Sequence, residues 1–138
     1  MRYLLDTNIV SETIKSAPNE NVRTFLQEVP PHSLYFSVLS LGEIRCGIEK
    51  LKIKDKKHHD TLIIWFENNL IPWFGPNILP VTEEVADCWG HLVGNSPRKL
   101  PAIDSLLAAT CLTFNLKLVT RNVKDFPIPH LEIINPWL

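Results

Sequence analysis

The order of the hydrophobic segments constrains the fold of this chain more than any other feature. Short apolar runs, typical of buried strands, alternate with longer stretches in which apolar residues recur at helical spacing. We expect strands over residues 3–5, 33–38, 77–81, 116–120 and 131–135, and helices over 7–16, 19–29, 39–53, 60–72, 82–94 and 101–115. This alternation predicts an α/β fold, a three-layer α/β/α sandwich around a central, mostly parallel sheet.

Length and composition indicate one domain. With 138 residues, 45% of them hydrophobic, the chain can bury one proper core, so we expect a single domain over residues 1–138. The net charge of -1 excludes a global positive field, and any nucleic-acid binding has to rest on local basic patches. No segment approaches the roughly 18 apolar residues of a spanning helix, which predicts a soluble, cytoplasmic protein without membrane contact.

The three cysteines argue against two kinds of small scaffold. Cys46, Cys88 and Cys111 are widely spaced and contain no CxxC pair, unlike a disulfide framework or a thiolate zinc site. We expect all three to be reduced residues of the core.

Four acidic residues follow strand ends or nearby loops. Asp6 directly follows the first strand, and Glu43 lies in the first turns of the helix after the second strand. Asp104 lies in the first turn of its helix, and Asp125 comes shortly after the fourth strand. Because open parallel sheets bind ligands outside the carboxyl ends of their strands, we expect these carboxylates to share one edge of the sheet.

Each acid also has a structural alternative. Asp6 could cap the helix that follows it, and Glu43 completes an S-x-x-E capping box with Ser40. The helix dipole favours Asp104 in a first turn, and Asp125 could be an ordinary turn residue. The combination of four acids favours a functional site over these structural roles, because converging carboxylates raise one another's pKa unless a cation lies among them.

Mg²⁺ or Mn²⁺ would suit such a cluster. Both prefer oxygen ligands, and Mg²⁺ keeps several waters and leaves room for a substrate phosphate. One ion polarises a phosphoryl oxygen and lowers the pKa of a bound water, and a pair about 3.5–4 Å apart stabilises both attacking and leaving oxygens. The pattern therefore indicates a phosphodiester-cleaving site that needs no protein nucleophile.

Four stretches carry a resemblance to a known family. They read "YLLDTNIVSE", "LYFSVLSLGEIRCGIEKL", "LPAIDSLLAATCLTFNLKLVTRNVKDF" and "INPW". In this order, from end to end of the chain, they resemble the PIN-domain ribonucleases, and within them the VapC and FitB-like toxins of type II toxin–antitoxin pairs. The resemblance implies that Asp6, Glu43 and Asp104 bind the metal, and that Thr7 and Asn8 shape the pocket.

The resemblance also implies an activity and partners. The protein would have a PIN-like fold and be an Mg²⁺- or Mn²⁺-dependent endoribonuclease, a toxin that inhibits translation by cleaving RNA. Its partner would be a small VapB/FitA-like antitoxin. The chain would form homodimers and also hetero-oligomers with the antitoxin, and it would contact DNA only through the antitoxin.

The chain departs from the family pattern in its last motif. Many members carry a further Asp after Thr-Arg, where this chain has Asn122 after Thr120 and Arg121. Asn is a neutral oxygen donor, so the fourth acidic contribution could come from Asp125, one helical turn on. We place Asp125 in the site, with Thr120 and Asn122 as hydrogen-bonding neighbours.

Several basic residues are candidates for contact with RNA phosphates. They are Arg45, Arg98, Lys99 and Arg121. For Arg45, a salt bridge to a nearby acid is an equal alternative. The densest basic run, residues 50–59, is favoured as a solvated turn between helices.

Two other functions stay open at this point. A phosphoryl-transfer hydrolase of the haloacid-dehalogenase kind would use Asp6 as its nucleophile. Such enzymes favour a second Asp two residues on, where this chain has Asn8. A catalytically idle RNA-binding PIN module is the other alternative, and the full set of acids argues against it.

Overall fold

A five-stranded parallel sheet forms the centre of the computed structural model, which describes all residues from 1 to 138. The strands lie in the order β3-β2-β1-β4-β5. They are β1 (Tyr3–Leu5), β2 (Leu34–Ser37), β3 (Ile78–Leu79), β4 (Lys117–Val119) and β5 (Ile133–Ile134). Leu4 lies opposite Tyr35 of β2 and Leu118 of β4, so β1 is the central strand. The predicted parallel sheet is confirmed.

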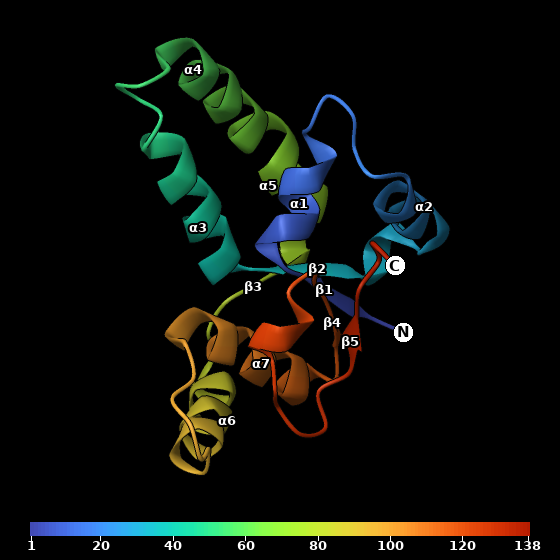
Figure 1. Ribbon diagram of the computed structural model, residues 1–138, viewed down its shortest axis with the longest axis vertical. Helices are drawn as coiled ribbons and strands as arrows, with labels where there is room; N and C mark the ends of the chain where they lie inside the picture. The colour runs from blue at the N-terminus through green and yellow to red at the C-terminus, as the bar shows by residue number, and fades with distance from the viewer.

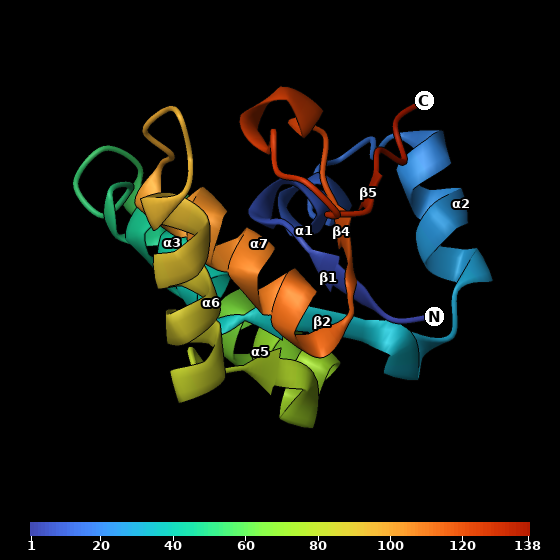
Figure 2. The same ribbon diagram turned by 90° about the horizontal axis from the view of Figure 1, so that it is seen from below.

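Helices cover both faces of this sheet, as Figures 1 and 2 show. One face carries α1 (Thr7–Thr13), α2 (Glu20–Glu28), α3 (Val38–Glu49), α4 (Lys56–Trp65) and α5 (Ile71–Phe74), with a π-helical segment (Phe66–Leu70) between the last two. The other face carries α6 (Glu83–Gly94) and α7 (Ala102–Phe114). Three short 3-10 turns cover Pro31–Ser33, Gly75–Asn77 and Val123–Asp125. None of the helices is long and apolar enough to span a membrane.

The alternation of strand side chains divides the core into two parts. Tyr3 and Leu5 of β1 pack with Phe36 of β2 on the face that carries α1 to α5. Leu4, between them, packs with Leu118 of β4 on the face that carries α7. Successive strand residues point to opposite faces, and full burial of one such side chain contributes about 1.5–3 kcal/mol. The side chains of β1 therefore pack against helices on both faces of the sheet, as the predicted α/β/α sandwich requires.

The helix α3 begins earlier than the sequence predicted. The hydroxyl of Ser37 accepts the backbone N–H of Leu39 at 3.1 Å and caps the helix at the end of β2. The predicted capping box of Ser40 and Glu43 is therefore wrong. Ser40 lies inside the helix, where its buried hydroxyl has no hydrogen-bond partner.

The helix α4 also begins earlier than predicted. Oδ1 of Asp55 accepts the backbone N–H of His58 at 3.1 Å, so the helix starts at Lys56. The basic run over 50–59 is thus a turn in its first half and helix in its second. Figure 1 shows α3 and α4 side by side, joined at the end far from the sheet.

The cysteines differ from one another in burial. Cys111 is buried and Cys88 is half-buried, whereas Cys46 is exposed on α3. All three thiols are free, but the placement of Cys46 in the core was wrong, because its side of α3 does not face the sheet.

The order of the strands places a switch point at β1. After β1 the chain builds β2 and β3 on one side, and then returns to build β4 and β5 on the other. Open α/β sheets bind ligands at such a point, outside the carboxyl ends of the strands. Asp6 follows β1 and Thr120 follows β4, so both residues lie at this position.

Candidate functional site

Asp6 is the anchor of the candidate site. Its backbone N–H donates to the carbonyl oxygen of Val119 at 2.9 Å and extends the pairing of β1 with β4. Oδ1 of Asp6 accepts the backbone N–H of Thr7 at 2.7 Å, and Oδ2 accepts the hydroxyl of Thr120 at 2.8 Å. The residue thus caps α1, as its structural alternative predicted, and is also the centre of a polar network. Only 8% of Asp6 is exposed.

Thr120 joins the ends of β1 and β4 through its side chain. Its buried hydroxyl accepts the side-chain amide of Asn8 at 3.2 Å and the backbone N–H of Asn122 at 3.0 Å, while it donates to Asp6. Oδ1 of Asn8 accepts the backbone N–H of Arg121 at 3.4 Å. Asn8 and Thr120 therefore enter the network through their side chains, and Asn122 only through its backbone.

Glu43 reaches this network from α3. The hydroxyl of Thr7 donates to Oε1 of Glu43 at 2.9 Å and connects the first turn of α1 with α3. Glu43 is exposed, and its second oxygen has no hydrogen-bond partner in the protein. Thr7 thus orients a carboxylate that stays accessible to a ligand.

Asp104 joins the cluster through electrostatics. It lies half-buried in the first turn of α7. Burial, together with the charges of Asp6, Asp125 and Glu43, raises its pKa to about 6. Asp104 therefore lies within reach of the charges of the other three acids predicted from the sequence.

The pKa of Asp6 is raised as well. Burial raises its pKa, and the charge of Asp125 adds to the shift. The hydrogen bonds from Thr120 and Thr7 oppose the shift, because they stabilise the ionised carboxylate. Asp125 itself is exposed at the end of the turn over Val123–Asp125.

The donors of this site fit a hard divalent cation. The groups that converge offer carboxylate, hydroxyl and amide oxygens, which are the ligands of Mg²⁺ and Mn²⁺. No three His, Cys, Asp or Glu side chains are arranged to hold one ion between them. Mg²⁺ keeps several waters and is usually bound through one or two carboxylates, so an open cluster suits it. The candidate ligands are Asp6, Glu43, Asp104 and Asp125.

The basic residues predicted to bind RNA differ in their surroundings. Nε of Arg45 donates to Glu49 at 3.1 Å, and its guanidinium lies 5.6 Å from the ring centre of Phe66. The ion pair, within α3, is the salt bridge expected as the alternative, and the contact with Phe66 connects Arg45 to the π-helical segment after α4. Arg98 and Lys99 are exposed in the loop before α7 and form no ion pair.

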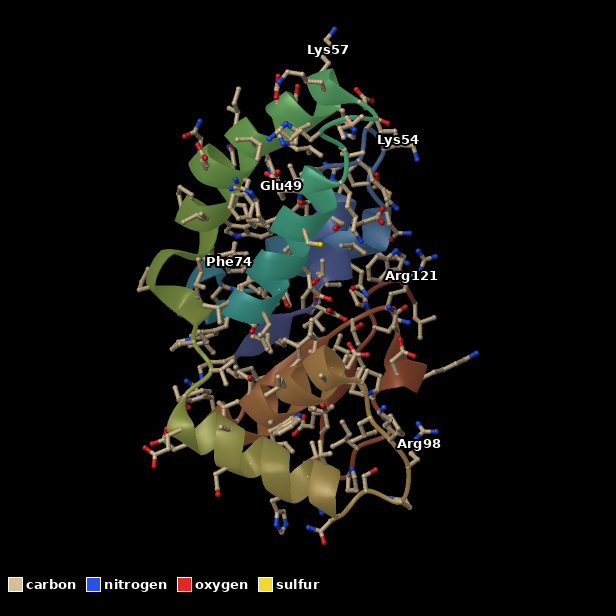
Figure 3. The ribbon with its side chains drawn as sticks, turned by 90° about the vertical axis from the view of Figure 1, so that its left-hand side faces the viewer. Glu49, Lys54, Lys57, Phe74, Arg98 and Arg121 are labelled. Atoms are coloured by element: carbon tan, nitrogen blue, oxygen red, sulfur yellow. The ribbon has the colours of Figure 1, made fainter.

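The backbone of Arg121 adjoins the polar network, where its N–H donates to Asn8, and the charge of its side chain acts on Glu12. Its guanidinium is 5.2 Å from the ring centre of Trp137, a cation–π distance that restricts the side chain. Figure 3 shows Arg98 and Arg121 along one edge of the molecule, with Glu49 elsewhere, on α3.

A buried acid on α1 was missed at the sequence level. Glu12 forms a 2.8 Å ion pair with Lys15, and its other oxygen accepts the backbone N–H of Asn19 at 2.9 Å. These two contacts lower the pKa of Glu12 and hold the loop between α1 and α2. The available signal was its spacing, one turn after Asn8 on the same helix.

A hydrogen bond behind Asp104 was missed as well. The indole N–H of Trp89 on α6 donates to the buried hydroxyl of Ser105 at 2.9 Å. This bond holds α6 against the first turn of α7, which carries Asp104. No pattern in the sequence indicates it, because the pairing depends on the packing of two helices.

The fold and the site together define an α/β protein with an acidic, oxygen-rich site at the switch point of a parallel sheet. The family model described as "PIN domain" matches residues 3–127, a range that includes all four acids. The chain belongs to the PIN domain family.

Named relatives match nearly the whole chain. Toxin FitB of Neisseria gonorrhoeae is 31% identical, over 97% of this chain and 97% of FitB. VapC ribonuclease Y4jK of Sinorhizobium fredii is 26% identical, over 97% and 96% of the two chains. Among solved structures, FitAcB from Neisseria gonorrhoeae contains a chain with a TM-score of 0.88 and 30% identity, covering 98% of each chain. FitAB bound to an IR36 DNA fragment also gives 0.88, at 29% identity and 99% and 96% coverage. The predicted PIN-like fold is confirmed.

Replacing Asp104 with Asn should stabilise the metal-free protein at neutral pH. Folding raises the pKa of this carboxyl to about 6, so its ionisation destabilises the folded state as the pH rises from about 4 through about 6. The neutral variant lacks this penalty. Because Asp104 is only half-buried, we expect a gain of about 1 kcal/mol at about pH 8, vanishing near pH 4.

Urea unfolding in a chelating buffer measures this gain. Asp87→Asn, an exposed position on α6, is the matched control and should show no pH-dependent difference from the unmodified chain. Equal behaviour of the two variants at both pH values would contradict an electrostatic origin.

Proposed function

We propose that this chain is a metal-dependent endoribonuclease and the toxin of a type II toxin–antitoxin pair. The observation that carries the proposal is that burial and the charges of Asp6, Asp125 and Glu43 raise the pKa of Asp104 to about 6, so acids from three other parts of the chain act on one carboxyl. Such a cluster favours binding of a divalent cation, because the cation removes the repulsion. The names of two relatives, a toxin and a VapC ribonuclease, support the activity. Cleavage of RNA would inhibit translation.

Several acids would together bind Mg²⁺ or Mn²⁺. Asp6, Glu43 and Asp104 would hold the ion directly or through its bound waters, with Asp125 as the fourth acid. When bound, the ion supplies a water of lowered pKa and polarises a phosphoryl oxygen. Asp6 is fixed at the end of β1, and Glu43 and Asp104 approach from helices on opposite faces of the sheet.

The neutral residues would keep the carboxylates in position. The hydroxyls of Thr120 and Thr7 donate hydrogen bonds to Asp6 and Glu43, respectively. The side-chain amide of Asn8 donates a hydrogen bond to Thr120. These hydrogen bonds fix the acceptor oxygens before substrate arrives, so less reorganisation is needed on binding. Asn122 would contribute its backbone N–H to the same network.

The residue two positions after Asp6 argues against the rival phosphoryl-transfer hydrolase. Asn8 stands where such enzymes favour a second acid, and its side-chain amide donates to Thr120. A phospho-aspartate trapped at Asp6 would overturn this argument. The idle RNA-binding module differs only in lacking turnover, so a cleavage assay separates it from the proposal.

The proposed partners follow from the similarity of this chain to FitB. The FitAB structure contains a bound DNA fragment, and FitB is named a toxin. We therefore propose a small FitA/VapB-like antitoxin as partner, with DNA contacted through the antitoxin and RNA as the substrate. The chain would form homodimers and hetero-oligomers with the antitoxin, and it would act in the cytoplasm.

Asp6→Asn and Asp104→Asn should each reduce RNA cleavage at least about 100-fold, because each removes a charged ligand of the ion. Both variants should keep the circular dichroism spectrum of the unmodified chain. Turnover of purified RNA with Mg²⁺ and Mn²⁺ measures the effect, and Asp87→Asn should stay active. Unchanged turnover in either site variant would refute the assignment, and RNA binding without cleavage by the unmodified chain would establish the idle module.

Inducible expression of the chain should arrest growth, and co-expression of the small protein encoded beside it should relieve the arrest. Mapping of RNA ends after induction should reveal new ends that are absent in the Asp104→Asn strain. Arrest that persists in the Asp104→Asn strain would show that toxicity does not come from cleavage.

A further inference from the structure

A groove lined mainly by polar residues adjoins the acidic cluster at Asp125. It has a volume of about 550 Å³, and the side chains that give it its chemistry are Arg121, Asn122, Lys124, Asp125 and Asn135. We call it the Asp125 groove. Its volume lies within the range of about 300–1,000 Å³ typical of small-ligand sites, so it can receive a group of nucleotide size.

Two cations of this groove form no ion pair. Arg121 and Lys124 are exposed, and neither forms an ion pair with a carboxylate. The Trp137 ring holds Arg121 in place, whereas Lys124 extends from the short turn that ends at Asp125. A phosphate would therefore find two available positive charges next to the cluster.

Two amides of the groove also have free hydrogen-bonding groups. The side chain of Asn122 forms no hydrogen bond, because only its backbone joins the Thr120 network. Oδ1 of Asn135 accepts the backbone N–H of Trp137 at 3.0 Å, which leaves its NH₂ group free. Amides of this kind bind the edges of unpaired bases, which are the usual target of sequence-specific RNA recognition.

The groove is continuous with the acids through Asp125. That carboxylate lines the groove and also acts by its charge on Asp6 and Asp104. A second groove of about 590 Å³ is lined by Glu43 of α3, by Lys50 directly after that helix, and by Ile103 next to Asp104. Acids of the cluster therefore line two open grooves.

We propose that the Asp125 groove binds one nucleotide of single-stranded RNA next to the bond that is cleaved. Lys124 and Arg121 contact its phosphate, and the amide of Asn135 contacts its base. This inference rests on the proposed ribonuclease function and deepens it, because it identifies the residues that determine where along an RNA the chain cuts.

The test measures binding separately from cleavage. Lys124→Gln and Lys57→Gln are each introduced into the Asp104→Asn protein, which should bind RNA without cleaving it. Each double variant, and the Asp104→Asn protein alone, is titrated into a fluorescein-labelled, single-stranded oligoribonucleotide. Figure 3 shows Lys57 at the tip of α4, far from Arg121, so it is the matched control for loss of one surface charge. Lys124→Gln should weaken binding and reduce the slope of log K against log salt by about 0.7, the value for one phosphate contact to a single strand. Lys57→Gln should leave both quantities unchanged.

Steady-state cleavage gives the second readout. In the active protein, Lys124→Gln should raise KM with little change in kcat, because it removes a contact made equally in the ground and transition states. Asn135→Asp keeps the acceptor for Trp137 but loses the amide donor, and should change which nucleotide is preferred beside the cut.

The outcomes separate the two proposals. If Lys124→Gln behaves like Lys57→Gln in binding, or if no RNA binds, the groove is not a nucleotide site. If the unmodified chain cleaves nothing while Lys124→Gln still shows the reduced salt slope, the groove is supported and the enzymatic function fails.

Discussion

The junction between Asp6 and the end of β4 is the interaction on which the rest of the site depends. The backbone of Asp6 pairs with Val119, and its carboxylate accepts the hydroxyl of Thr120. These two contacts fix the carboxyl ends of adjacent strands at the point where the connections diverge. Glu43 and Asp104 then approach the same place from α3 and α7, on opposite faces of the sheet. A displacement of β1 relative to β4 would therefore break up the whole cluster.

The cluster is maintained against its own electrostatics. Burial and mutual repulsion raise the pKa of Asp104 and of Asp6, so the fold alone does not favour four ionised acids here. The packing of β1 and α7 in the core, together with hydrogen bonds from Thr7 and Thr120, holds them in place. The proposed cation would remove this repulsion and stabilise the folded protein, so the carboxylates would serve function rather than folding.

Much of this arrangement could be predicted from local signals in the sequence. The period of apolar residues indicated the order of strands and helices, and Asp6 could be placed because a strand plainly ends before it. Details that depend on tertiary packing could not be predicted. Ser37, rather than Ser40, caps α3 because β2 ends there, and the contact of Trp89 with Ser105 exists only once α6 and α7 pack. The sequence placed Asp125 in the site and Asn122 beside it, but it could not indicate that Asn122 would join the network through its backbone, because that contact depends on the turn after β4.

The most direct test of the account is the location of a divalent ion in crystals of the active protein. Anomalous diffraction from crystals containing Mn²⁺ should show the ion bound by the carboxylates of Asp6 and Asp104, and crystals of the Asp6→Asn variant should lack it. Mn²⁺ bound only at other residues, or absent from crystals of a protein that cleaves RNA, would contradict the claim that these acids share a cation.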